Sequence, residues 1–153
     1  MKSPFDTDGK SYEYGKSVES LFKEIGEKNG FKVEESSDYE NIHGHIDFFI
    51  TSPDNKRLSV DVKGMKKLNR SDESVQDEWL FLEFKNVHGN KGWLYGMAEL
   101  ISFEMKDRFT FIKRKILIDI AEKLVDINKK VFRSSEAKYK TYTRNNRRNA
   151  NGC

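Results

Sequence analysis

The chain contains very little cysteine. Its 153 residues include a single one, Cys153, at the end of the sequence. One cysteine cannot close an internal disulfide, and it cannot supply the thiolate cluster of a zinc site. We therefore exclude zinc–thiolate sites and Cys-His catalysis for this protein.

Long apolar runs are also missing from the sequence. No apolar segment approaches the length of a membrane span, and the segment Met1 to Asp6 lacks the apolar core of a signal peptide. We expect a cytoplasmic protein with no membrane partner. Hydrophobic residues make up 36% of the chain, which is enough for one core, so we expect a single domain over residues 1–133 and a separate tail over residues 134–153.

The charge of the chain is unevenly distributed. The net charge of the whole chain is only +3. The stretch from Lys129 to Arg148 combines eight basic residues with one acidic residue and so has a net charge of +7. The rest of the chain therefore has a net charge of −4. A basic tail on an acidic body is typical of a phosphate-binding arm, and we expect it to be disordered until it meets a polyanion. The eight basic residues are Lys129, Lys130, Arg133, Lys138, Lys140, Arg144, Arg147 and Arg148.

The first half of the chain predicts one helix followed by three strands. Apolar residues at helical spacing, ended by Asn29 and Gly30, indicate a helix from about Tyr12 to Asn29. The turn formers between the second and third strands indicate an antiparallel hairpin. The three expected strands are Phe31–Glu35, His45–Ile50 and Leu58–Gly64.

The second half predicts further strands and a closing helix. After a polar loop over Met65–Asp77, we expect a strand at Glu78–Val87 and a hairpin formed by Met97–Glu104 and Arg108–Arg114. A helix should follow over Lys115–Val131. Its buried stripe would be Ile116, Ile120, Leu124 and Ile127. The order of elements predicts a mixed α/β (α+β) domain, with a central mixed sheet flanked by an N-terminal and a C-terminal helix.

The strand Leu58–Gly64 carries the most informative pattern. Side chains alternate along a strand, so the aliphatic residues face one way while Asp61 and Lys63 share the other face. A carboxylate and an ammonium on an apolar strand are costly to bury unless they bind something, such as a metal ion and a water. This arrangement indicates phosphodiester chemistry.

Two further acids extend the pattern. Asp47 lies on the preceding strand, fourteen residues before Asp61, and Glu19 lies on the first helix. Over about Tyr14 to Phe84 this order resembles the PD-(D/E)xK nuclease superfamily, which has the restriction-endonuclease-like fold. Holliday junction resolvases and related phage nucleases of that superfamily carry such a helix glutamate. The proline of the motif is replaced by Ile46, as in many members.

The resemblance implies a metal-dependent site. Asp47, Asp61 and the Val62 carbonyl would bind Mg²⁺ or Mn²⁺, because a hard divalent cation with oxygen ligands relieves the repulsion of two carboxylates. Lys63 would position the attacking water or stabilise the growing charge. Glu19 would lie near this edge as a further catalytic acid, or it is simply a solvated helix residue. No organic cofactor is implied.

The acid-x-Lys triplet alone is weak evidence. The chain contains six such triplets, and one of them, Glu83-Phe84-Lys85, also lies in a predicted strand. With Asp61 as the first acid it would form an alternative site. We favour Asp61 and Lys63 because the preceding helix and strand then follow the order of the superfamily.

Several residues are candidates for contacting nucleic acid. His43 and His45 could form a zinc site, but a contact of His45 with a substrate phosphate fits the pattern better. Trp93 is as well suited to the core as to base stacking. The contact candidates are His45, Lys66, Lys67, Arg70, Asn86, Lys91 and, in the tail, Lys138, Lys140, Arg144, Arg147 and Arg148.

The sequence thus favours a metal-dependent DNA endonuclease. Its small size, without a separate recognition domain, is typical of structure-selective or phage-encoded nucleases that act on junctions or branched DNA, often as homodimers. Two alternatives remain open. One is a nucleic-acid-binding protein that keeps the scaffold without the reaction, and the other is an interaction protein that inhibits a host factor.

Overall fold

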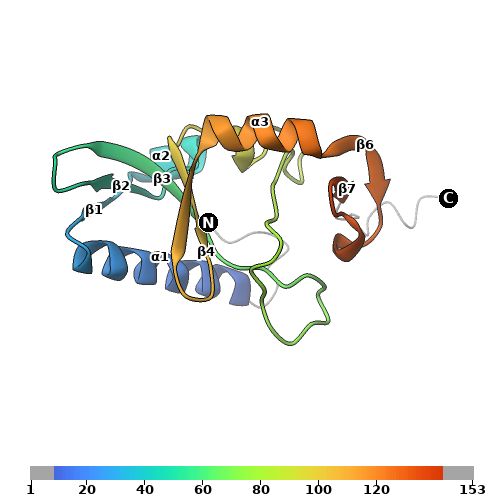
Figure 1. Ribbon diagram of the computed structural model, residues 1–153, viewed down its shortest axis with the longest axis horizontal. Helices are drawn as coiled ribbons and strands as arrows, with labels where there is room; N and C mark the ends of the chain where they lie inside the picture. Colours follow the sequence, from blue (N-terminus) through green and yellow to red (C-terminus); the bar gives the residue numbers. More distant parts are fainter. Residues whose placement is uncertain (1–8, 143–153) are drawn as a thin grey trace.

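A computed structural model describes residues 9–142 of the chain (Figure 1). It has three α-helices, two short 3-10 helices and seven strands within that range. Their order is α1 (Lys10–Lys28), β1 (Lys32–Glu35), α2 (Asp38–Gly44), β2 (Phe48–Thr51), β3 (Arg57–Lys63), η1 (Trp93–Tyr95), β4 (Leu100–Glu104), β5 (Phe109–Lys113), α3 (Arg114–Leu124), β6 (Asp126–Val131), η2 (Ser134–Glu136) and β7 (Lys140–Tyr142).

Strands β1 to β5 form one mixed sheet in sequence order. All neighbouring strands are antiparallel except β3 and β4, which are parallel. Parallel neighbours require a crossover connection, which is usually a helix. Here residues 64–99 make the crossover, and η1 is the one helical element within them. The predicted mixed α/β class, with an N-terminal helix and a mixed sheet, is confirmed.

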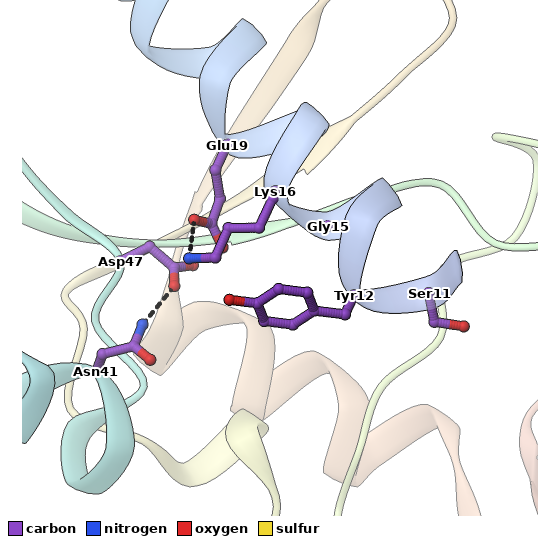
Figure 2. A pocket seen from close by; sticks show the side chains of 7 residues that line it. All are labelled: Ser11, Tyr12, Gly15, Lys16, Glu19, Asn41 and Asp47. Atoms are coloured by element: carbon purple, nitrogen blue, oxygen red, sulfur yellow. Dashed lines mark hydrogen bonds and ion pairs between the residues drawn. The ribbon is translucent and has the colours of Figure 1, made fainter. Parts of the chain in front are cut away.

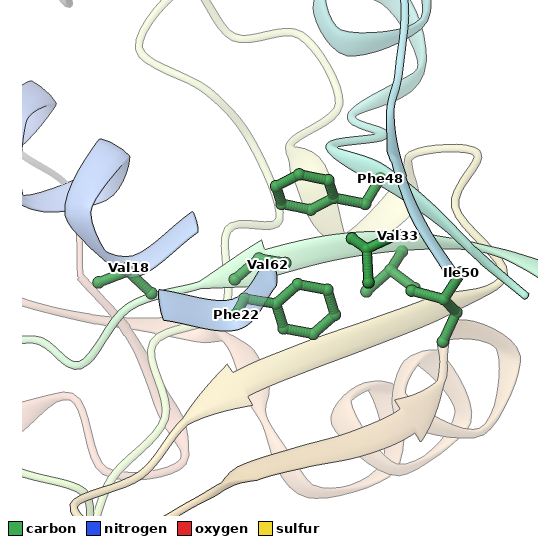
Figure 3. Close-up of a cluster of buried hydrophobic side chains, with 7 residues drawn as sticks. Val18, Phe22, Val33, Phe48, Ile50 and Val62 are labelled. Atoms are coloured by element: carbon green, nitrogen blue, oxygen red, sulfur yellow. The ribbon is translucent and has the colours of Figure 1, made fainter. Parts of the chain in front are cut away.

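Helix α1 covers one face of the sheet. Val18 and Phe22 on α1 pack against buried side chains of β1, β2 and β3 (Figure 3). The ring of Phe22 stacks on Phe48 with centroids 5.4 Å apart and meets Phe109 edge-on at 5.3 Å. This cluster explains the apolar stripe of the first helix. Its other members are Val33, Ile50, Val60 and Val62.

Helix α3 covers the opposite face, so the sheet lies between the two helices (Figure 1). Leu117 and Ala121 on α3 pack against Ile101 and Phe103 of β4 and against Leu94 of η1. The predicted buried stripe of this helix is wrong. Ile116, Ile120 and Leu124 are exposed, because α3 turns the side that contains Leu117 and Ala121 toward the sheet. Ile127 is also exposed, but it lies beyond α3, on β6.

Residues 78–87 do not form the predicted strand. The Glu83 and Phe84 carbonyls accept hydrogen bonds from Leu94 and Gly92, so this segment pairs locally with the start of η1. The position beside β3 is taken by β4 instead. A short helix that the sequence analysis omitted, α2, begins at Ser37 with a capping box, in which Ser37 and Glu40 each bond to the other's backbone amide.

The C-terminal part also differs from expectation. The last helix ends at Leu124 rather than Val131, and β6 follows it and pairs in parallel with β7. Residues 134–142, which we expected to belong to a disordered tail, contain η2 and β7. Across the described residues, no helix has both the length and the apolar character needed to cross a membrane.

The orientation of α3 can be tested by two substitutions. Leu117 is 6% exposed and Ile120 is 44% exposed. We expect Leu117→Ala to lower the free energy of unfolding by about 2–5 kcal/mol, because it leaves a cavity in the core. Ile120→Ala should change it by only about 0.5 kcal/mol. Urea unfolding of both variants measures the difference. A larger loss for Ile120→Ala would contradict this packing.

Candidate active site

The second strand begins at Phe48 rather than at the predicted His45, so Asp47 lies directly before β2 and is held against β3. Its amide donates to the Val60 carbonyl at 2.9 Å, and its Oδ2 accepts from the Val62 amide at 2.7 Å. The two bonded residues of β3, Val60 and Val62, are the sequence neighbours of Asp61. Asn41, from α2, donates through Nδ2 to the Asp47 Oδ1 at 2.8 Å (Figure 2). Both oxygens of the Asp47 carboxylate are therefore oriented by neutral amide donors.

Asp61 is the most deeply buried charged residue on β3, with 1% of its surface exposed. Its Oδ1 lies 2.8 Å from the Lys63 Nζ, so the two residues singled out in the sequence form an ion pair. Its Oδ2 has no hydrogen-bond partner and lies 3.7 Å from an Arg114 guanidinium nitrogen. Two cations thus offset the charge of one buried carboxylate, which is otherwise strongly unfavourable.

Arg114 connects this carboxylate to the crossover segment. Its Nε donates to the Ala98 carbonyl at 2.6 Å, and a terminal nitrogen donates to the carbonyls of Trp93 and Leu94. The side chain is buried at the start of α3. Since three backbone carbonyls and Asp61 share one guanidinium, the position of η1 depends on the same group that neutralises the site.

Lys63 is placed between Asp61 and an aromatic ring. Its Nζ lies 4.6 Å from the centroid of Trp93, which itself packs edge-on against Phe103. Trp93 therefore contributes both to the core and to the site. The next residue, Gly64, passes α1 closely, since a Cβ there would lie 2.9 Å from the Tyr14 ring.

Glu19 reaches the same region from α1. It pairs with the Lys16 Nζ at 3.1 Å, and together with Asp47 it lines a pocket of about 200 Å³ (Figure 2). Burial raises the pKa of Glu19, and the negative charge of Asp47 raises it further. The helix glutamate is therefore a half-buried neighbour of the Asp47 carboxylate and not a solvated residue.

The electrostatics of the site reflect crowded negative charge. Burial, together with the charge of Asp61, raises the pKa of Asp47 from 3.8 to about 6. Burial also raises the pKa of Asp61, and the positive charges of Lys63 and Arg114 oppose this shift. The carboxyl groups of Asp47 and Asp61 therefore lie near enough to repel each other, as expected of paired ligands of a cation.

His45 lies beside this cluster. It ends α2 in the left-handed region, with φ 51°, and is half-buried. Burial lowers its pKa, and the positive charge of Lys63 lowers it further. Of its neighbour His43, the structure shows a ring contact with Tyr39 at 4.4 Å. A zinc site built on the two histidines receives no support from this arrangement.

The other predicted nucleic-acid contacts are scattered. Lys66, Lys67 and Arg70 are exposed on the segment after Gly64, while Lys138 lies over the Trp79 ring and Lys140 begins β7. Lys91 is exposed near Tyr95. Asn86 has a structural role, because its side-chain oxygen accepts hydrogen bonds from the His88 and Asn90 amides and closes a turn. Arg144, Arg147 and Arg148 lie outside the described residues.

The competing triplet at Glu83 lies off the sheet. The Glu83 side chain accepts from the Trp93 amide, and the Lys85 backbone bridges to Lys91. Neither residue lies on a strand beside Asp61. The geometry therefore favours Lys63 as the lysine that accompanies Asp61.

The donor set fits a magnesium-type ion better than a zinc-type ion. Within residues 9–142, no three His, Cys, Asp or Glu side chains gather into a ready metal cluster. Mg²⁺ commonly uses only one or two carboxylates and completes its shell with water and substrate phosphate oxygens. The carboxylates of Asp47 and Asp61, which lie near enough to affect each other's charge, supply such a pair. The Val62 carbonyl remains a prediction as a third donor.

Sequence reasoning missed two residues of the site. Asn41 lies on α2, and the pattern Ser37-Asp38-Tyr39-Glu40 could have revealed that helix as a capping box. Arg114 had no such signal, because nothing in the sequence distinguishes it from the neighbouring Lys113 and Lys115. Its importance appears only when α3 packs against the sheet.

The chain was compared with known protein families, curated proteins and solved structures, and it matches none of them. The interpretation of the site therefore depends on its own geometry.

The raised pKa of Asp47 predicts a pH dependence of stability. An acid with a higher pKa in the folded state binds more protons when folded, so the free energy of unfolding falls as the pH rises from 3.8 to about 6. Asp47→Asn should remove a component on the order of 2 kcal/mol from this fall. Urea unfolding in chelator at several pH values measures it. Asp119→Asn, on the exposed side of α3, is the control variant. An unchanged slope in Asp47→Asn would contradict the burial argument.

Proposed function

We propose that the protein is a metal-dependent endonuclease that hydrolyses phosphodiester bonds of DNA. The observation that carries the proposal is the meeting of Asp47 and Asp61 at the junction of β2 and β3, with the Lys63 ammonium 2.8 Å from Asp61. The likeness to the PD-(D/E)xK superfamily noted in the sequence supports the same reading. The order of α1 and three antiparallel strands agrees with it as well.

The residues of the chain would act as follows. Asp47 and Asp61 would bind Mg²⁺ or Mn²⁺, which polarises a scissile phosphate and lowers the pKa of a bound water. Lys63 carries its positive charge beside this point, where it can stabilise the charge that develops on the phosphate. Asn41 and the Val62 amide orient Asp47, so its oxygens need no rearrangement when the substrate arrives.

DNA is the proposed partner, and the exposed lysines and Arg70 after Gly64 supply charge for its backbone. The homodimer suggested by the resemblance stays a prediction. Sedimentation of the purified protein measures it directly.

Cleavage assays test the proposed reaction. We expect wild-type protein to cut labelled junction, flap, single-stranded or duplex DNA in Mn²⁺ or Mg²⁺ and to stop in chelator. Asp47→Asn and Lys63→Ala should each reduce the rate by at least about 100-fold, because each removes a group that acts on the reacting phosphate. Lys85→Ala, which changes the competing triplet, should retain activity. Robust cleavage by folded Lys63→Ala protein would refute the assignment.

A second prediction concerns metal binding without DNA. A ligand that binds only the folded state stabilises it by about 2.7 kcal/mol at one hundred times its dissociation constant. Mn²⁺ should therefore raise the melting temperature of the wild type, and Asp47→Asn should abolish most of the shift. Asp119→Asn is the matched control. An equal shift in all three proteins would show that the ion binds elsewhere.

A second candidate function is supported by the burial of Asp61. A carboxylate already neutralised by Lys63 and Arg114 can be purely structural, as in a nucleic-acid-binding protein that keeps the scaffold without the reaction. That protein would bind DNA in a salt-sensitive manner and yield no metal-dependent product. The cleavage and melting experiments separate the two candidates.

A further inference from the structure

We propose that the pocket between α1 and α2 receives an unpaired nucleobase of the substrate strand. The inference builds on the proposed function, because it takes the substrate of the Asp47 site to be nucleic acid. It also goes further, since it names a strand with an accessible base as the preferred substrate. The pocket is lined by Ser11, Tyr12, Gly15, Lys16, Glu19, Asn41 and Asp47 (Figure 2).

Gly15 gives the first argument. It lies inside α1, where glycine is among the least favourable residues. A Cβ at Gly15 would meet nothing within 4 Å, so packing within the chain does not require a glycine there. Gly26 of the same helix is different, because its Cβ would lie 2.9 Å from Val33. The missing side chain of Gly15 leaves space in the pocket. A ligand that enters this space would account for a glycine at a position where it lowers the stability of the helix.

The side chains that line the pocket indicate which kind of ligand it can bind. Tyr12 points from the first turn of α1 toward Asn41 and Asp47 (Figure 2). The residue is 36% exposed, and the Lys16 ammonium lies 5.8 Å from the centroid of its ring. Nucleobases stack on such rings regardless of sequence. The volume of about 200 Å³ far exceeds the roughly 10–15 Å³ of such space that holds one water, so it suits a base-sized group.

The charges of the pocket favour a base over a phosphate. Glu19 and Asp47 contribute two carboxylates, and Lys16, which is paired with Glu19, contributes one ammonium. Carboxylates repel a phosphate but accept hydrogen bonds from the amino groups of bases. Because Asp47 lies in the wall, a base in this pocket would place its own backbone next to the candidate metal site.

The location defines the substrate class. A base within a duplex is stacked and paired, and extracting it costs free energy, whereas a single strand or an unpaired stretch beside a branch presents its bases without that cost. A nuclease with this pocket should therefore prefer single-stranded or branched DNA to continuous duplex.

Binding in chelator tests the pocket without any cleavage. The probes are labelled oligo(dA) and a strand of the same length made of abasic sugar phosphates, with fluorescence anisotropy at one salt concentration. We expect wild-type protein to bind oligo(dA) about tenfold more tightly than the abasic strand, as one base–aromatic stack provides. Gly15→Leu should fill the pocket and reduce this ratio to about one. Ser20→Leu adds the same side chain at an exposed position of α1 outside the pocket and should keep the ratio.

Two further results complete the design. Tyr12→Ala should also lose the preference for bases, and it replaces Gly15→Leu if that variant fails to fold by circular dichroism. The proposal is overturned if wild-type protein binds both strands equally, or if folded Gly15→Leu keeps the full ratio. Metal-dependent cleavage without a base preference would leave the endonuclease intact and reject the pocket. A base preference without metal-dependent cleavage would support the pocket and reject the endonuclease.

Discussion

The burial of two neighbouring acids, Asp47 and Asp61, is the constraint around which this domain is arranged. Asp61 is almost completely buried on β3, and such a charge is tolerated only with close partners. Lys63 supplies one partner from the same strand and Arg114 supplies the other from α3. Because Arg114 also binds the carbonyls of Trp93, Leu94 and Ala98, the irregular crossover is fixed by the group that neutralises the acid.

The two acids differ in their hydrogen-bond and ion-pair partners, and this difference affects which of them can bind a cation. Asp61 is offset by full positive charges, whereas Asp47 is oriented by the neutral amides of Val62 and Asn41. Burial together with the charge of Asp61 keeps the pKa of Asp47 near 6. A cation that approaches this edge would therefore gain most of its stabilisation from Asp47 and would leave the ion pair of Asp61 and Lys63 largely undisturbed.

How far the sequence predicts the structure depends on whether the interactions involved are local or distant. The first helix and the first three strands follow from apolar periodicity and turn residues, and the convergence of Asp47 with Asp61 follows from their hairpin. The crossover was harder to predict, because residues 78–87 have the alternation of a strand but find their partners in residues 91–94. The buried face of α3 was assigned to Ile120 rather than Leu117, since both faces are apolar and only tertiary packing chooses between them.

The position of Lys63 shows why this lysine suits the proposed hydrolysis better than an exposed one. Its ammonium is fixed between the Asp61 carboxylate and the face of Trp93, two groups that attract a cation. The side chain is nevertheless 24% exposed, so its ammonium can still donate to an oxygen that arrives from solvent. A positive charge fixed before the substrate arrives costs no reorganisation during the reaction. Lys85 lacks this advantage, because it is exposed on a segment that pairs with Lys91 and lies on no strand of the sheet.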